Sequence, residues 1–142
     1  MKAVLYDSSI YVAALRSGDH GVLSVRRLDS GSVVWLSVVV LEELYAGAND
    51  RGLPIVERLE RDFDRAKRVL VPNASDWTET GRVLSRLAAK YDYEHIGRGR
   101  LTNDALIAMS AGRLGICVMT ANERDFRRLA EFRSFQWQVT AV

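Results

Sequence analysis

Short runs of β-branched and other apolar residues alternate along this 142-residue chain with longer segments whose apolar residues recur every three or four positions. The short runs are typical of buried strands, and the longer segments have the periodicity of helices that pack on one face. Strands that alternate with helices form parallel sheets, because each crossover returns the chain to the same end of the sheet. The pattern predicts an α/β fold, with three α/β/α layers around a central, mostly parallel sheet.

The expected strands are Lys2–Tyr6, Val33–Ser37, Val69–Val71, Ile116–Met119 and Ser134–Thr140. Helices are expected after Asp7-Ser8-Ser9, in the segment from Val22 to Leu28, over 38–48, from Val56 to Leu70, from Asp76 to Tyr91, from Asn103 to Leu114, and after Asn122. Asp76 with Glu79 predicts the start of the fifth of these helices, and Thr102 the cap of the sixth. No repeat, low-complexity stretch or linker interrupts the chain, so a single domain over 1–142 is expected.

Composition excludes several classes of protein. The chain is 48% hydrophobic and 27% charged, which is ordinary for a globular protein and unlike a disordered chain. The longest apolar stretch, Val33–Leu41, is far shorter than the roughly 20 residues that cross a membrane, so no membrane association is expected. The single cysteine, Cys117, cannot form an internal disulfide, which fits a reducing cytoplasm. The net charge of +2 is too small to indicate a polyanionic partner.

The common nucleotide-binding and hydrolase motifs are missing. The sequence has no G-x-x-x-x-G-K-[ST] loop, no G-x-G-x-x-G after a strand and no H-E-x-x-H. Its two histidines, His20 and His95, lie in polar stretches without the spacing of metal ligands. Histidine-based hydrolysis and zinc chemistry are therefore not expected.

Acidic and amide side chains follow the ends of successive expected strands. They are Asp7, Glu43, Asp104, Asn122 and Asp125. In a parallel sheet these positions gather at the carboxyl edge, where ligands bind. Two bare carboxylates 4 Å apart repel each other by about 4 kcal/mol at an effective dielectric constant of 20, so such a cluster must take up protons or a cation. Ligands that are all oxygen favour magnesium or manganese.

Each of these residues also has a structural explanation. Asp7 can cap a helix, Asp104 can interact favourably with a helix N-terminus, and Asn122 with Asp125 resembles a capping box. Glu43 can be an ordinary residue of a helix surface. Spacing by itself leaves both explanations open.

Four sequence blocks together resemble PIN-domain ribonucleases of the VapC toxin type. The blocks are an apolar strand that ends in Asp7-Ser8-Ser9, the segment from Ser37 to Gly47, the segment Arg100-Leu101-Thr102-Asn103-Asp104-Ala105-Leu106-Ile107-Ala108, and Thr120-Ala121-Asn122-Glu123-Arg124-Asp125-Phe126. Their order and spacing agree with the family over nearly the whole chain. The third block is the most specific of the four.

The resemblance implies that Asp7, Glu43 and Asp104 bind one or two Mg²⁺ or Mn²⁺ ions. Glu43 is preferred to Glu42 because the family's acid stands four residues before the glycine, here Gly47. The fourth block departs from the family pattern, because Asn122 stands where many relatives carry Asp. Asn122 or Asp125 would then complete the catalytic set. Ser8 or Ser9 and Thr120 would orient the acids.

The same resemblance implies metal-assisted hydrolysis of RNA phosphodiesters, which blocks translation and growth. It further implies a homodimer and a VapB-like antitoxin that covers the cleft. Arg98 and Arg100 flank Gly99 just before Asp104 and are the expected contacts to RNA phosphates, although the same residues would serve a solvated loop equally well.

Two other functions fit parts of the pattern. A PIN-like module that binds RNA or a partner without cutting it would explain the neutral Asn122. A phospho-acceptor domain also places an aspartate after a strand, but it requires an acidic pair after its first strand, and this sequence has Asp7-Ser8-Ser9.

Overall fold

The computed structural model describes residues 2–18, 31–92 and 100–140. Within them the chain forms a sheet of five strands, β1 (Ala3–Tyr6), β2 (Val33–Ser37), β3 (Val69–Leu70), β4 (Cys117–Thr120) and β5 (Trp137–Val139). The helices are α1 (Ser8–Ser17), α2 (Val38–Gly47), α3 (Leu53–Arg65), α4 (Ala74–Tyr91), α6 (Arg100–Arg113) and α7 (Glu123–Ala130). Each pair of neighbouring strands is parallel.

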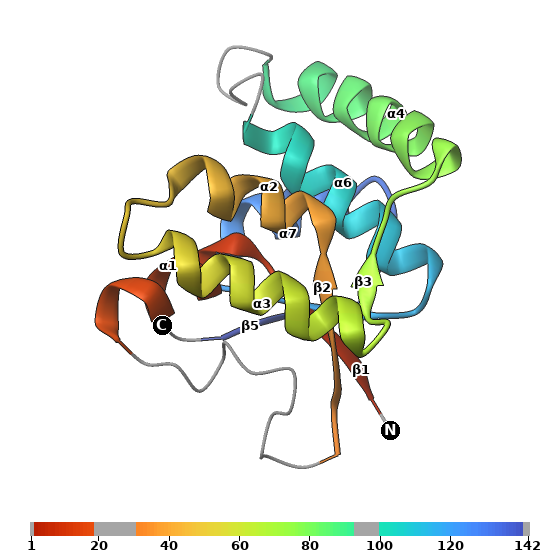
Figure 1. The fold of residues 1–142 in the computed structure, drawn as a ribbon. Coiled ribbons are helices and arrows are strands. Elements are labelled where there is room, and N and C mark those ends of the chain that lie inside the picture. The colour runs from red at the N-terminus through yellow and green to blue at the C-terminus, as the bar shows by residue number, and fades with distance from the viewer. Residues whose placement is uncertain (1, 19–30, 93–99, 141–142) are drawn as a thin grey trace.

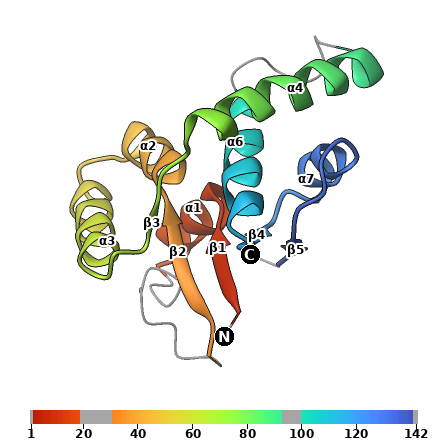
Figure 2. The same ribbon diagram turned by 90° about the vertical axis from the view of Figure 1, so that its right-hand side faces the viewer.

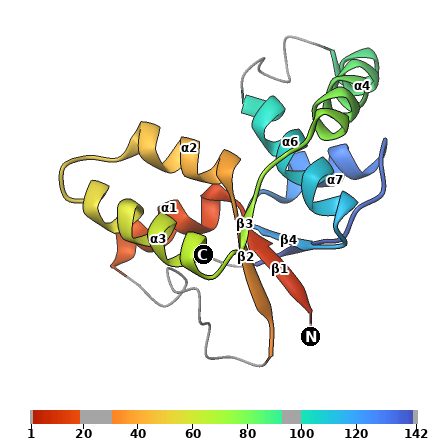
Figure 3. The same cartoon turned by 45° about the vertical axis from the view of Figure 1, so that its right-hand side comes forward.

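Helices cover both faces of the sheet, which confirms the predicted three-layer α/β/α fold (Figure 1). Figures 2 and 3 show α1, α2 and α3 on one side of the strands and α4, α6 and α7 on the other. Strands β1 and β4 are accordingly buried along most of their length, with Leu5 and Val118 fully inaccessible to solvent. Such continuous burial is typical of parallel strands that lie between two layers of helices. None of the helices in the described part of the chain is long and apolar enough to cross a membrane.

The strand order β3-β2-β1-β4-β5 places a topological switch point between β1 and β4. From β1 the chain first adds β2 and β3 on one side, and it later returns to add β4 and β5 on the other side. At such a point the connections that leave neighbouring strands diverge and open a crevice at the carboxyl ends of the strands. The fold therefore directs attention to the residues that follow Tyr6 and Thr120.

The boundary between α3 and β3 differs from the prediction. The predicted helix extended to Leu70, whereas α3 ends at Arg65 and Leu70 lies in β3. Lys67 adopts a positive φ of 57°, which turns the chain out of the helix. The apolar spacing of the helix continues as far as Leu70 because Leu70 is also buried, although it lies on β3. Burial alone does not distinguish a helix from the strand that follows it.

Two predicted helix starts are also wrong. The cap of α4 is Asn73, and Asp76 is the third helical residue, whose carboxylate completes a capping box with the Asn73 backbone. Helix α6 begins at Arg100, so Thr102 lies inside the first turn and is not a cap. β5 is shorter than predicted, at Trp137–Val139. The helix predicted from Val22 to Leu28 lies outside the described residues.

Candidate active site

Asp7 lies at the switch point, directly after β1. Its backbone N–H donates to the Met119 carbonyl of β4 at 3.0 Å, which extends the β1–β4 pairing by one residue. Asp7 is also the N-cap of α1, and its carboxylate accepts from the Ser9 backbone N–H at 3.1 Å. The structural explanation offered by the sequence is thus correct for Asp7. It does not account for the remaining contacts of this carboxylate.

Both carboxylate oxygens of Asp7 are held by hydroxyl groups. Ser9 Oγ donates to Oδ1 and Thr120 Oγ1 donates to Oδ2, each at 2.5 Å. Backbone N–H groups at the end of β4 donate in turn to these hydroxyls, Ala121 to Ser9 Oγ at 3.2 Å and Asn122 to Thr120 Oγ1 at 2.9 Å. Linked hydrogen bonds of this kind polarise one another and fix orientation. Asp7 therefore has one defined orientation at the edge of the sheet.

The Asp7 side chain is buried, and the described part of the chain provides no cationic partner for it. Asp7 is 2% exposed, and no salt bridge to it is found among residues 2–18, 31–92 and 100–140. Burial raises the pKa of Asp7 above its ordinary value, and the hydrogen bonds from Ser9 and Thr120 oppose that change without cancelling it. A negative charge at this position is consequently costly unless a cation reaches it.

Glu43 lies on α2, which begins at Val38 directly after β2. Ser8 Oγ donates to Glu43 Oε1 at 3.2 Å, which connects Glu43 with the residue next to Asp7. Burial raises the pKa of Glu43, and the negative charges of Glu42 and Asp7 raise it further, against the Ser8 hydrogen bond and the nearby Asn103 amide. Glu43 is half-buried whereas Glu42 is exposed. Glu43 is thus the more buried of the two acids, and its preference over Glu42 as a site residue stays a prediction.

Asp104 is buried near the start of α6, at 9% exposure. The preceding residue, Asn103, donates from Nδ2 to Glu42 Oε2 at 3.3 Å. This contact joins α6 to α2 one residue away from both Asp104 and Glu43. The sequence did not predict a role for Asn103; the only signal was its position beside Asp104.

Asn122 and Asp125 form the start of α7 after β4. Asn122 caps the helix by accepting from the Asp125 backbone N–H at 3.4 Å, as predicted. Its amide Nδ2 donates to Asp125 Oδ2 at 2.9 Å, while Arg124 Nε lies 3.2 Å from Asp125 Oδ1. Because Arg124 is 73% exposed, its compensation of the Asp125 charge is weak.

The structure brings together part of the predicted site. Asp7 and Glu43 interact electrostatically, and Asn122 is connected to Asp7 through Thr120. However, within the described residues no group of three or more His, Cys, Asp or Glu side chains has an arrangement that could hold a metal ion. Arg98 lies outside the described residues, and the side chain of Arg100 is not described either.

The available donors nevertheless suit a hard divalent cation. Asp7, Glu43 and Asp104 contribute carboxylate oxygens, and Asn122 contributes an amide oxygen. Oxygen ligands favour Mg²⁺ or Mn²⁺ over the softer transition metals. Burial raises the pKa of Asp7 and of Glu43, and no salt bridge to either is found among residues 2–18, 31–92 and 100–140. A cation bound beside them would neutralise these two charges.

The chain thus has a parallel sheet with an acid at its switch point and further acids on the flanking helices α2 and α6. The PIN domain family matches residues 4–132, and the chain therefore belongs to the PIN-domain family. Among curated proteins, the chain is 26% identical to the tRNA(fMet)-specific endonuclease VapC of Shigella flexneri, over 96% of this chain and 99% of that protein.

Solved structures agree on the fold. The DNA-bound VapBC complex from Salmonella typhimurium contains a chain that matches with a TM-score of 0.71 at 23% identity, covering 98% of each chain. VapBC2 from Rickettsia felis, bound to a promoter DNA fragment, gives a TM-score of 0.72 at 19% identity, covering 98% of this chain and 99% of that chain. At these identities the likeness concerns the fold.

Proposed function

We propose that this chain is a Mg²⁺- or Mn²⁺-dependent ribonuclease that acts as the toxin of a toxin–antitoxin pair. The main support is Asp7, a buried carboxylate at the switch point of a PIN domain that is oriented by hydroxyls and has no ion pair among the described residues. By contrast, the buried Asp76 of the same fold is paired with the Arg113 guanidinium. Glu43, which lies within electrostatic range of Asp7, adds a second acid for which no salt bridge is found among the described residues.

The residues divide the catalytic work between them. A bound cation would supply water activation near neutral pH and positive charge for the phosphorane-like transition state. Asp7, Glu43 and Asp104 would hold that cation, while Ser9 and Thr120 keep Asp7 in one orientation. Asn122 or Asp125 would complete the set from the start of α7. No side chain has to act as the nucleophile.

The proposed partner is a VapB-like antitoxin that inhibits by placing a cationic side chain among Asp7, Glu43 and Asp104. The solved neighbours are VapBC complexes, which supports a partner of this type. A homodimer in the cytoplasm is part of the same proposal. Metal and antitoxin should then compete, since both would neutralise the same acids.

The first substrate to test is initiator tRNA, because the Shigella flexneri relative is named as an endonuclease specific for tRNA(fMet). The purified protein is incubated with initiator tRNA and with total RNA, in Mn²⁺ or in EDTA, and the new RNA ends are sequenced. We expect cleavage in Mn²⁺ that stops in EDTA and in Asp104→Asn. Cleavage that persists in EDTA and in the Asp104→Asn protein would contradict the proposed site.

A second candidate is a PIN module that binds RNA or a partner without cutting it. The neutral Asn122, and the separation of the acids among the described residues, favour this alternative. Under this alternative the wild type binds RNA in Mn²⁺ but leaves it intact. The cleavage assay therefore separates the two candidates directly.

A further inference from the structure

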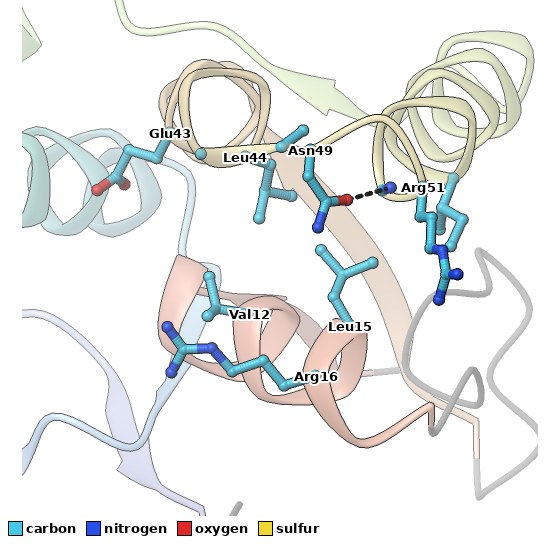
Figure 4. A pocket seen from close by; sticks show the side chains of 11 residues that line it. Val12, Leu15, Arg16, Glu43, Leu44, Asn49 and Arg51 are labelled. Carbon is cyan, nitrogen blue, oxygen red and sulfur yellow. Dashed lines mark hydrogen bonds between the residues drawn. The ribbon is translucent and has the colours of Figure 1, made fainter.

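A pocket of about 360 Å³ lies between α1, α2 and the turn that joins α2 to α3 (Figure 4). Its surface is somewhat more apolar than polar, and the side chains of Val12, Leu15, Leu44 and Ile55 form the aliphatic part. The volume is at the lower end of the range found for small-ligand pockets, so it suits one compact group. Glu43 of the proposed active site is among the residues that line it.

The polar residues of the pocket lie at its ends. Figure 4 shows the Arg16 guanidinium directed toward the end where Glu43 lies, and Arg51 at the opposite end. Neither arginine forms a salt bridge within the part of the chain that the structure describes. Asn49 Oδ1 accepts from the Gly52 backbone N–H at 2.8 Å, and the Asn49 amide nitrogen is turned toward the middle of the pocket.

We propose that this pocket binds one nucleotide of the RNA substrate, next to the phosphate that is cleaved. The base would lie on the aliphatic surface of Leu15 and Leu44, and Arg16 and Arg51 would contact backbone phosphates. This inference rests on the proposed ribonuclease function and names a substrate subsite for it.

Three features favour an RNA nucleotide as the occupant. A nucleotide within a strand combines a flat, weakly polar base with a phosphate on each side, which matches an aliphatic centre with a cation at each end. Guanidinium groups suit phosphate oxygens because their planar fork donates two hydrogen bonds. Glu43 of the proposed site also lines one end of the pocket, so a nucleotide bound there would lie beside one of the proposed metal ligands.

The first experiment measures binding apart from cleavage. A fluorescein-labelled single-stranded RNA of mixed sequence is titrated with the inactive Asp7→Asn protein at several salt concentrations. Arg16→Ala and Arg51→Ala should each weaken binding and lower the slope of log affinity against log salt by about 0.7, the value for one lost phosphate contact on a single strand. Arg86→Ala, an exposed arginine of α4, is the matched control and should leave both quantities unchanged.

The second experiment changes the substrate and leaves the protein intact. RNAs that lack a single base near the cleavage site are compared with the complete RNA. With the wild type, the loss of one base next to the cleaved bond should raise KM severalfold, because the apolar surface of the base no longer leaves water in the pocket. In Leu15→Ser the same loss should have little further effect, because the surface that the base contacts is already impaired.

Unchanged RNA affinity and salt slope in both arginine variants would overturn the inference. It is also overturned if these variants bind RNA normally but escape inhibition by the purified antitoxin, because the pocket would then be a protein-docking site. In either case the proposed function survives as long as the wild type cleaves RNA. If the wild type cleaves no RNA, the proposed function fails, and the binding titration still decides whether the pocket binds a nucleotide.

Discussion

Asp7 and Asp76 are both buried aspartates at helix N-termini, yet their surroundings differ. Asp76 is 3% exposed, and the Arg113 guanidinium binds its carboxylate through Nε at 3.0 Å and through a second nitrogen at 3.0 Å. Asp7 is 2% exposed and is held by two hydroxyls and the Ser9 backbone N–H. Thus the charge of Asp76 is paired with a guanidinium, whereas these contacts of Asp7 only orient its carboxylate.

This difference separates a structural acid from a functional one. The Asp76–Arg113 pair joins the start of α4 to the end of α6, where a paired charge contributes to packing. At Asp7 burial raises the pKa, and no cation among residues 2–18, 31–92 and 100–140 offsets the loss of solvent. An acid that is oriented but not neutralised is suited to bind an external cation.

The largest expected effect is on activity at Asp7. Asp7→Asn keeps the shape of the side chain but removes its charge, so we expect RNA cleavage to fall by more than about 100-fold while the protein stays folded. Cleavage rates in Mn²⁺ and circular dichroism measure the two quantities. Asp64→Asn, at an exposed position of α3, is the control and should cleave normally. An active Asp7→Asn protein would remove Asp7 from the site.

At the Asp76–Arg113 pair we expect a loss of stability with little change in the cleavage rate. Arg113→Ala leaves the buried Asp76 charge unmatched, and we expect the free energy of unfolding to fall by about 2 to 3 kcal/mol, less than for a fully buried pair because Arg113 is 34% exposed. Urea denaturation measures this change. The cleavage rate per folded molecule should stay close to that of the wild type. If Arg113→Ala were stable but inactive, the division between the two aspartates would be wrong.

The gain in the free energy of unfolding on Mn²⁺ binding should depend on Asp7 and not on the Asp76–Arg113 pair. When Mn²⁺ exceeds its dissociation constant 100-fold, the wild type should gain about 2.7 kcal/mol through mass action. Asp7→Asn should lose most of this gain, and Arg113→Ala should keep it from a lower starting point. Thermal melts with and without Mn²⁺ give the comparison. A melting temperature that Mn²⁺ leaves unchanged in the wild type would count against a metal site.

The free energy of unfolding should depend on pH by a smaller amount than it depends on Mn²⁺, and it should fall as the pH rises. The folded state binds the Asp7 proton more tightly than the unfolded state, so in EDTA stability should fall as the pH rises from the ordinary value of 3.8 through the raised pKa of Asp7. Glu43 acts in the same direction. Asp7→Asn should show a shallower decline in urea midpoints over this window. An identical decline in both proteins would assign the pH dependence to other groups.

The smallest effects on cleavage are expected at Asn122 and Asp125, the two candidates to complete the catalytic set. The exposed Arg124 already compensates part of the Asp125 charge. Asp125 carries the charge and orients the Asn122 amide, so we expect Asp125→Ala to lower cleavage more than Asn122→Ala. Asn122→Asp should preserve activity or tighten metal binding. Metal-dependent cleavage rates of the three variants decide the order. Reversed losses for the two alanine variants would show that the amide completes the site.

The sequence predicted the local features of this protein well. Alternating strands and helices, the Asp7 and Asn122 caps and the α/β/α layers all follow from residue type and spacing over short distances. The PIN resemblance also came from the sequence and is confirmed by the family match over residues 4–132. The errors concern the ends of three helices, near Leu70, Asn73 and Thr102. The buried strand after α3 continues the apolar spacing of that helix, and at the starts of α4 and α6 more than one nearby residue is of a type that can cap a helix.

Only the tertiary structure decided which charges are matched. Thr120 reaches Asp7 across 113 positions, Ser8 reaches Glu43 across 35, and Arg113 reaches Asp76 across 37. Residue type gives no information on these partners, because both aspartates follow the same rule for helix N-termini. Strand order and helix packing determine which aspartate meets a guanidinium and which meets hydroxyls. Since that choice sets the cost of the buried charge, it also separates the acid that stabilises the fold from the acid available to a cation.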